Sequence, residues 1–300
     1  MIFTLTCNIL AETVARYPSV SIGSTMRAES VSFRVGGKGV NVSRALAALG
    51  VGTFAVAVGG GSSGRRCAEC LRREEAFESF VAPAPFEARS GWTAFDVSAN
   101  AETSFLGADA ELTCADFISA LDAVGRRAGE GDVLALCGSV PGWGPGMADG
   151  LFALARSKGL RLAFDTYGAP LCDLFASESE AVKINSGEFA AYARSRGFEG
   201  SLEEAFGIFE KECGAKFFAV TDGAGTAFAR ACGEVRSFDP PKVEPPVFAT
   251  GCGDAAMAVI LAAVSRGSCG FDDFEAALAF ASRCAASPEL LPADCSGILP

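Results

Sequence analysis

A glycine turn at residues 250–255, TGCGDA, opens a nearly all-apolar stretch, so Asp254 stands in the first turn of a predicted buried helix. The preceding residues Gly251, Cys252 and Gly253 offer consecutive backbone N–H groups that can hold an anion. The adjoining carboxylate can accept a proton. Phosphoryl transfer to a hydroxyl requires both groups. The alternative is structural, with Asp254 only stabilising the helix dipole.

A second glycine-rich stretch, VGGKGVNVSRA at residues 35–45, precedes an Ala- and Leu-rich segment. Glycines at the start of a helix let the backbone approach a ligand closely. The stretch is not a Walker A loop, because Gly rather than Ser or Thr follows Lys38 and Ser32 occupies the place of the first glycine. It predicts either a ligand-binding turn or a plain entry into a helix.

Two further patterns are weaker. Residues 59–64 satisfy GxGxxG after a predicted strand, which leaves nicotinamide or flavin binding as an alternative. No acidic residue ends a second strand about 20 residues later, as that fingerprint requires. Cys67 and Cys70 have CxxC spacing without a second pair, which favours buried structural thiols over a metal or redox site.

Composition excludes several classes of function. The 25 basic and 36 acidic residues leave a net charge of −11, which disfavours nucleic acid and membrane surfaces as partners. The chain contains 0 histidines, so His-activated nucleophiles, HExxH metal sites and histidine general bases are ruled out. Acid–base chemistry therefore falls to Asp, Glu, Lys, Tyr or Cys.

The compartment is inferred from the N-terminus and the cysteines. Residues 1–10 lack the basic region of a signal peptide, and no apolar run approaches the roughly 20 residues of a membrane span. The 12 cysteines are scattered without a disulfide-like pattern. We expect reduced thiols and a cytoplasmic location.

Short apolar runs alternate with helix-like segments along most of the chain. The predicted strands are Ile2–Cys7, Thr53–Val58, Val133–Cys137, Leu160–Asp165, Ala181–Ile184 and Phe217–Thr221. Helical spacing appears in Val40–Leu49, Cys67–Glu75, Phe117–Ala128, Gly146–Ser157 and Leu202–Glu212. Strands separated by helices predict an α/β fold with a mostly parallel sheet covered on both faces.

Two segments depart from this pattern, at about residues 11–34 and 88–107. They are rich in Ser, Thr, Val and Phe, and their partial alternation predicts exposed antiparallel strands. Two such insertions can pair into a small sheet beside the main one. We therefore expect residues 1–300 to form a single α/β domain with a β appendage.

Six landmarks in one order resemble the ribokinase-type (PfkB) carbohydrate kinases. These are GGKGVNVSRALAALG at 36–50, CGSVP at 137–141, FDTYG at 164–168, VKINSGE at 182–188, VTDGA at 220–224 and TGCGDA at 250–255. The resemblance covers about residues 1–290 and is greatest to the 1-phosphofructokinase and tagatose-6-phosphate kinase branch. It implies a three-layer α/β/α core, with the β appendage acting as a lid that closes over the sugar.

The resemblance also implies a role for each matching residue. Asp254 would be the catalytic base, and Gly251, Cys252 and Gly253 would form the anion hole. Substrate-binding positions would be Glu12, Arg27, Gly37, Lys38, Asn41, Arg89, Ser139 and Asp254. Nucleotide-binding positions would be Lys183, Asn185, Thr221, Gly223, Gly225 and Gly253. Asn185 and Glu188 would hold Mg²⁺ through water. ATP and Mg²⁺ are thus implied, with room for a monovalent cation and for a homodimer formed through the lid.

Three positions differ from the family pattern. Glu12 stands where the family has an Asp that binds sugar hydroxyls. Residues 88–92, ARSGW, keep the arginine of the family's T-R-x-N segment but lose its threonine and asparagine. Arg89 and Arg27 are the candidate clamps for a sugar phosphate. The substrate therefore stays open between a sugar and a sugar phosphate.

Three functions follow from these observations. The first is ATP-dependent phosphorylation of a sugar or sugar-phosphate hydroxyl. The second is a nucleoside or other small-alcohol kinase of the same superfamily, which residues 102–108, ETSFLGA, faintly resemble. The third is a catalytically weak protein that binds sugar or nucleotide for regulation, consistent with the altered lid.

Overall fold

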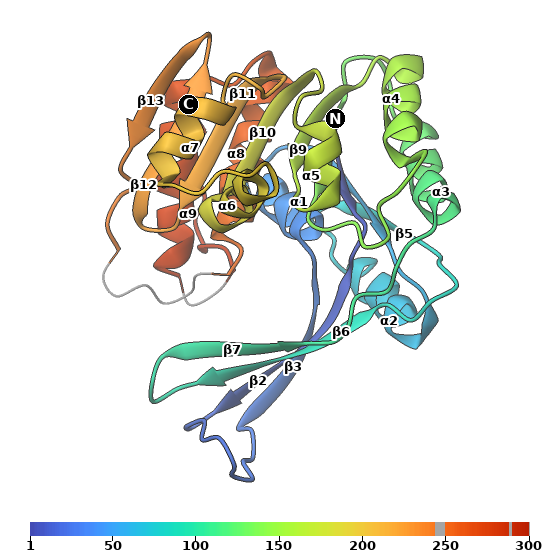
Figure 1. Cartoon of the computed structure of the whole chain (residues 1–300). Helices are drawn as coiled ribbons and strands as arrows, with labels where there is room; N and C mark the ends of the chain where they lie inside the picture. Colours follow the sequence, from blue (N-terminus) through green and yellow to red (C-terminus); the bar gives the residue numbers. More distant parts are fainter. Residues whose placement is uncertain (244–249, 288–289, 300) are drawn as a thin grey trace.

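The computed structural model describes residues 1–243, 250–287 and 290–299. Its main sheet has nine strands in the order β13-β12-β11-β10-β9-β8-β1-β4-β5 (Figure 1). From β5 to β11 neighbouring strands are parallel, whereas β12 and β13 add an antiparallel edge. The strand bounds are β1 Ile2–Thr6, β4 Thr53–Val58, β5 Glu78–Ala82, β8 Val133–Cys137, β9 Arg161–Asp165, β10 Ser179–Asn185, β11 Ala215–Asp222, β12 Gly225–Ala231 and β13 Glu234–Phe238.

Helices cover both faces of this sheet and make three layers. One face packs under α1 Lys38–Ala48, α8 Cys252–Arg266 and α9 Phe271–Ala285, with α2 Gly61–Leu71 beside them. The other face packs under α3 Cys114–Gly125, α4 Met147–Lys158, α5 Ala169–Leu174, α6 Ser186–Ser195 and α7 Leu202–Phe209. Alternate residues of a strand face opposite layers: Leu134 and Leu136 join one core, and Val133 and Ala135 join the other.

Helix α8 lies inside the molecule and not on its surface. All residues from Asp254 to Val264 are buried against the sheet, α1 and α9. A helix that is apolar on every side is stable only when neighbours cover every side. The position of its first turn is therefore set by the core.

The two β segments form a second, small sheet in the order β3-β2-β6-β7. Its strands are β2 Leu10–Tyr17, β3 Ser30–Gly36, β6 Arg89–Asp96 and β7 Ala101–Leu106. We call this the small sheet. It extends away from the main sheet beneath the edge where α1 and α8 begin (Figure 1). Within each inserted segment the strands pair antiparallel, as predicted, but the pairing of β2 with β6, which joins the two segments, is parallel and not antiparallel.

The predicted fold class is confirmed, and the six predicted strands lie within the main sheet. Prediction missed β5, β12 and β13. Strand β5 is an edge strand with exposed positions, so its apolar pattern is weak. Strands β12 and β13 form a hairpin whose turn places Cys232 and Gly233 at φ 51° and 79°. Glycine is common in such turns but cysteine is not, so the sequence does not clearly indicate this turn. None of the described helices is long and apolar enough to cross a membrane.

Aromatic packing under α6 and α7 gives the first testable prediction. Phe206 is 1% exposed and stacks on Phe218 with ring centroids 4.9 Å apart. We expect Phe206→Ala to lower the free energy of unfolding by about 3–5 kcal/mol, because it removes buried area and leaves a cavity. Urea unfolding measures the change.

The matched control lies on the same helix. Ile208 is 47% exposed, so Ile208→Ala should change the free energy of unfolding by less than about 0.5 kcal/mol. Equal losses in the two variants would contradict the packing argument.

Candidate active site

The candidate site lies where the parallel strands end. Helix α8 begins at Cys252, and its N-cap Gly251 has a φ of 84°, a left-handed conformation that glycine adopts without strain. The first helical hydrogen bond of α8 runs from Ala255 N to Gly251 O, 2.9 Å, so the amides of Gly253 and Asp254 precede it and face outward from the helix start. Asp254 itself is 7% exposed.

A chain of hydrogen bonds orients the Asp254 carboxylate. Asn41 Nδ2 donates to Asp254 Oδ2 over 2.8 Å. Arg44 donates to Asn41 Oδ1 over 3.0 Å and is itself held by two bonds to Glu74. Because an arginine can only donate, it fixes which end of the Asn41 amide faces Asp254. Residues on the first turns of α1 thereby position a carboxylate on α8.

Two lysines share one fully buried carboxylate beside Asp254. Lys38 Nζ lies 2.9 Å from Asp165 Oδ1, and Lys183 Nζ lies 3.2 Å from Asp165 Oδ2. Lys183 also donates to Gly253 O over 3.0 Å, which ties β10 to the glycine turn of α8. Lys38 is the more exposed of the two, with 24% of its side chain accessible against 2% for Lys183.

Charge and burial shift the pKa values of these groups. Burial alone would raise the pKa of Asp165, but Lys183 and Lys38 outweigh it and hold that pKa below its usual value. Burial would lower the pKa of Lys38, but Asp165, Glu188 and Asp254 together raise it. Lys38 and Lys183 act on Asp254 only at longer range. Burial and then repulsion from Asp165 raise the pKa of Asp254 to about 6. The charged form of Asp165 is thus favoured, whereas the pKa of Asp254 is raised toward neutral pH.

Asn185 and Glu188 form a capping box at the start of α6. Asn185 Oδ1 accepts from Glu188 N, and Glu188 Oε2 accepts from Asn185 N. Glu188 Oε1 also accepts from Lys38 Nζ over 2.6 Å. Thr221 is the register partner of Asn185 on β11, and Gly223 and Gly225 follow in the turn to β12. The predicted nucleotide and metal residues thus lie on neighbouring strand ends, next to Lys38.

The face of the small sheet toward α8 carries polar side chains. Glu12 is 4% exposed and accepts from Arg34 Nε and Thr93 Oγ1. Glu102, on the same face, accepts from Thr250 Oγ1 over 3.2 Å. This contact joins the small sheet to the residue before Gly251.

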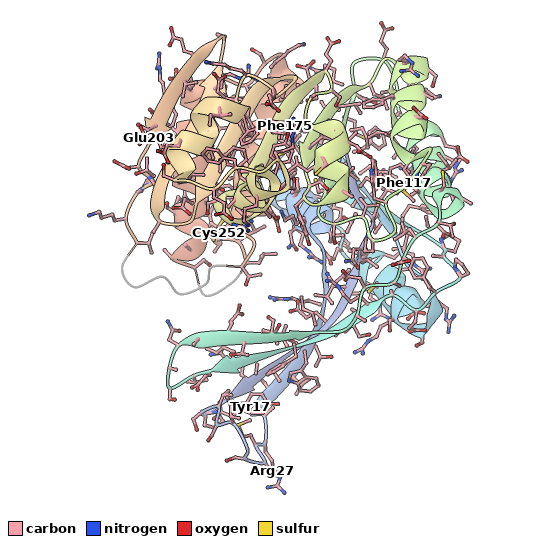
Figure 2. The ribbon with its side chains drawn as sticks, in the orientation of Figure 1. Tyr17, Arg27, Phe117, Phe175, Glu203 and Cys252 are labelled. Atoms are coloured by element: carbon pink, nitrogen blue, oxygen red, sulfur yellow. The ribbon has the colours of Figure 1, made fainter. Side chains whose placement is uncertain are left out.

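Of the other residues predicted to bind the sugar, most lie near Asn8 and one does not. Gly37, at φ 126°, is the N-cap of α1, and a Cβ there would lie 2.6 Å from Thr6 and 3.7 Å from the Asn8 carbonyl. Ser139 and Arg89 lie near Asn8, and Asp109 contacts both Asn8 and Arg89. Arg27 does not join them: it is exposed in the loop between β2 and β3, at the far tip of the small sheet, whereas Cys252 lies on the core (Figure 2).

The weaker motifs are accounted for by packing. A Cβ on Gly60 would lie 1.9 Å from Ala84 O, so the GxGxxG backbone is packed against its own chain. The amides of Ser62 and Ser63 at the start of α2 donate to Glu87, and the Ser63 bond leads those that lower the pKa of Glu87 to about 2. An internal carboxylate already fills this helix start, which disfavours the dinucleotide alternative.

Burial suppresses the reactivity of the thiols in two of the motifs. Burial raises the pKa of the Cys67 thiol to about 12 and that of Cys252 to about 11, so both are neutral near pH 7. Neither thiol is therefore in its nucleophilic thiolate form at this pH. Among the described residues, no group of three His, Cys, Asp or Glu side chains is arranged to hold a metal ion.

Sequence reasoning assigned no role to Asp165, Arg44 or Asp109. Asp165 ends an apolar strand, which is a usable signal because carboxyl ends of parallel strands converge at one edge. Arg44 lies three positions after Asn41, on the same side of a predicted helix. Asp109 lies in an irregular loop, and no pattern marks it.

Comparison with known proteins identifies the family. The model of the pfkB family carbohydrate kinases matches residues 7–287. The chain belongs to this family. This carbohydrate kinase is 29% identical over 273 residues to the 1-phosphofructokinase of Rhodobacter capsulatus, which covers 89% of this chain and 84% of the relative. The predicted family and enzyme class are therefore confirmed.

Two solved structures place the fold. Phosphofructokinase-2 from Escherichia coli in complex with potassium superposes with a TM-score of 0.86 at 21% identity, covering 98% of the kinase and 95% of that chain. Ribokinase from Thermotoga maritima superposes with a TM-score of 0.73 at 18% identity, covering 97% and 96%. At these identities the likeness establishes a ribokinase-like fold and no substrate.

The Asn41 contact gives a prediction for the pKa of Asp254. The hydrogen bond from Asn41 stabilises the charged carboxylate, so we expect Asn41→Ala to raise this pKa further above about 6. A ¹³C NMR titration of the carboxyl groups, with Asp254→Asn used to assign the signal, measures the shift.

Asn8→Ala is the control, since Asn8 bonds to Asp109 and Ser139 and not to Asp254 among the contacts described. An unchanged titration in Asn41→Ala would remove Asn41 as a determinant of the charge on Asp254.

Proposed function

We propose that this carbohydrate kinase transfers the γ-phosphate of ATP to a hydroxyl of a sugar or sugar phosphate, with Asp254 as the general base. The observation that carries the proposal is the buried carboxylate at the start of α8, held by Asn41 and poised near pH 6. A base with a pKa near the working pH combines the ionised form with useful proton affinity.

The chemistry at Asp254 is a single displacement. The acceptor hydroxyl oxygen forms a bond to the γ-phosphorus as the bond from that phosphorus to the bridging oxygen of ADP breaks. The hydroxyl proton passes to the Asp254 carboxylate. Asn41 engages Oδ2, which leaves the other oxygen as the acceptor. The products are the phosphate ester and ADP, and the proton returns to solvent.

Charge on the transferred group is stabilised by the start of α8 and by Lys38. The amides of Gly251, Cys252 and Gly253 lie at the positive end of the buried helix, where an anion is favoured. Lys38 stays protonated because carboxylates surround it, and it keeps part of its side chain exposed. Lys183 holds the turn in place through Gly253 O and supplies positive charge beneath it.

The nucleotide fits the neighbouring strand ends. Asn185, Thr221, Gly223 and Gly225 form the proposed ATP edge. Glu188 fits Mg²⁺ held through water: its carboxylate has about four acceptor positions, and the bonds described from Lys38 and Asn185 use two of them. When bound with ATP, the ion would neutralise phosphate charge. A potassium complex is known for phosphofructokinase-2 of Escherichia coli, and we propose a monovalent cation requirement here as well.

The sugar side is formed by α1 and the small sheet. We propose that Glu12, Gly37, Asn41 and Ser139 face the acceptor, and that the small sheet closes over it as a lid. The polar face of the small sheet and the Glu102–Thr250 contact support this role. The proposal of Arg27 as a clamp within the same subunit is not supported by its place at the distal tip.

The base assignment is tested by Asp254→Asn. We expect kcat to fall about 10²–10⁴-fold, since a positioned general base contributes that much. ATP consumption with a panel of sugars and sugar phosphates measures it. Asp272→Asn, an exposed aspartate in the first turn of α9, is the control and should retain full activity. Activity within tenfold of wild type in Asp254→Asn would remove the base.

The same assay read against pH separates the base from a structural aspartate. Because the carboxylate must be ionised and burial raises its pKa, kcat/KM should decline tenfold per pH unit below about pH 6, rather than below about pH 4. Nucleotide binding without turnover across the panel would favour the regulatory alternative.

We also propose a homodimer formed through the outer face of the small sheet. This face carries Trp92 and Phe105, exposed by 41% and 61%, beside a groove of about 610 Å³ that Phe33 and Arg66 also line. Adjacent apolar side chains at such exposure are typical of association surfaces.

Sedimentation tests the dimer. Trp92→Ser should raise the dimer dissociation constant at least tenfold, because central aromatic residues dominate such interfaces. Val235→Ser, at a 47% exposed position of β13 on the main sheet, should leave it unchanged. A monomeric wild-type protein at micromolar concentration would refute the dimer.

A further inference from the structure

The carboxylate of Asp109 lies among groups that could bind an anion on the proposed sugar side of the site. Asp109 Oδ1 accepts from Arg89 NH1 over 3.0 Å and from Asn8 Nδ2 over 2.8 Å. Asn8 Nδ2 also donates to Ser139 Oγ over 2.9 Å. Arginine, amide and hydroxyl groups are those that bind a phosphate ester. Here the arginine and the amide both bind a carboxylate of the protein, and the hydroxyl lies beside the amide.

The loop that carries Asp109 is anchored at both ends. It runs from β7 to α3, and Gly107 N donates to Ser90 O over 2.8 Å. At the other end Leu112 N donates to Pro141 O over 2.9 Å. Asp109 is therefore held close to Arg89, and an outside anion has to compete with a tethered one at high effective concentration.

The cluster belongs to the acceptor side of the site. Asn8 follows β1 and Ser139 follows β8, which are adjacent strands. Gly37, the N-cap of the helix whose Asn41 holds Asp254, lies over Asn8, so that a Cβ on this glycine would be 3.7 Å from the Asn8 carbonyl. Strand β10, which supports the α8 turn through Lys183, is two places beyond β8. At about 4.8 Å per strand, the end of β8 therefore lies roughly 10 Å from the end of β10.

Charge decides what the cluster accepts. Arg89 has 17% of its side chain exposed, and its buried Nε has no hydrogen-bond partner among the described residues. Its one described ion-pair partner is Asp109. The Asp109 side chain is 46% exposed, so its pair with Arg89 can be reached from solution. A phosphate ester at this place would either face the Asp109 carboxylate at short range or displace it from Arg89, and both outcomes are unfavourable for the ester. A neutral hydroxyl would instead donate to Asp109.

We propose that Asp109 is a specificity-determining residue that makes this kinase select a free sugar or polyol over its phosphate ester. The inference rests on the proposed function and narrows its acceptor. Arg89 positions Asp109 as the acceptor of a sugar hydroxyl, so the pair recognises a neutral group where Arg89 alone would recognise an anion.

The experiment compares matched pairs of acceptors. Fructose is paired with fructose 6-phosphate and fructose 1-phosphate, and tagatose with tagatose 6-phosphate. The readout is the ratio of kcat/KM for the ester to that for the free sugar, in wild type, Asp109→Ala and Asp109→Asn. Glu111→Ala removes an exposed carboxylate of the same loop and is the matched control. Thermal melting establishes that each variant is folded.

We expect a ratio below about 0.1 in wild type for the preferred sugar, and a rise of at least tenfold in Asp109→Ala. Asp109→Asn should raise the ratio less, because it keeps an oxygen against Arg89. Glu111→Ala should leave the ratio unchanged. A wild-type ratio above 1, or an unchanged ratio in a folded Asp109→Ala, would overturn the inference while leaving the kinase proposal intact.

Failure of the proposed function has a different signature. If no acceptor is turned over by any variant, the kinase proposal fails, and calorimetric binding of the same pairs then tests Asp109 alone. Binding of a phosphate ester by Asp109→Ala at least tenfold tighter than by wild type supports the specificity role. Equal binding by both proteins rejects it.

Discussion

The buried Asp165 carboxylate, shared between Lys38 and Lys183, is the interaction on which the site depends. Asp165 is 0% exposed, and an unpaired charge there would be strongly unfavourable. Each lysine also binds a second group: Lys183 donates to the Gly253 carbonyl under the α8 turn, and Lys38 donates to Glu188 at the start of α6. One ion triad therefore joins β9, β10, α1, α6 and α8 at the edge that carries the proposed active site.

The same triad explains why two nearby aspartates behave differently. Asp165 has both cations within hydrogen-bond distance and stays ionised, whereas Asp254 has an amide and a more distant positive charge. Burial and the negative charge of Asp165 then raise the pKa of Asp254 into the range useful for a base. The charge that stabilises the structure also tunes the neighbouring group.

Sequence predicted those parts of the molecule that depend on local patterns. The sequence predicted the apolar strands, the glycine turns at residues 36–39 and 250–253, and the alternating segments of the small sheet. These features depend only on the types and spacing of residues that are close in sequence. Contacts across the chain were not predicted. Arg89 and Asp109 are 20 positions apart, and Lys38 and Asp165 are 127 apart, so only the folded chain reveals their pairing. The place of Arg27 depended on the length of the β2–β3 loop, which composition does not determine.

Two of the four connections between the small sheet and the core are very short. Strand β1 ends at Thr6 and β2 begins at Leu10, so Cys7, Asn8 and Ile9 form one link, and Gly37 forms another between β3 and α1. The other two connections, residues 83–88 and 107–113, are longer, so a swing of the small sheet would turn mainly about the two short links. In the proposed function Asn8 and Gly37 would thus be a pivot of the lid as well as part of the acceptor pocket. Under the proposed function, closure of the small sheet would therefore change the backbone of the acceptor pocket itself, so that binding of the acceptor and the position of the small sheet would be mechanically coupled.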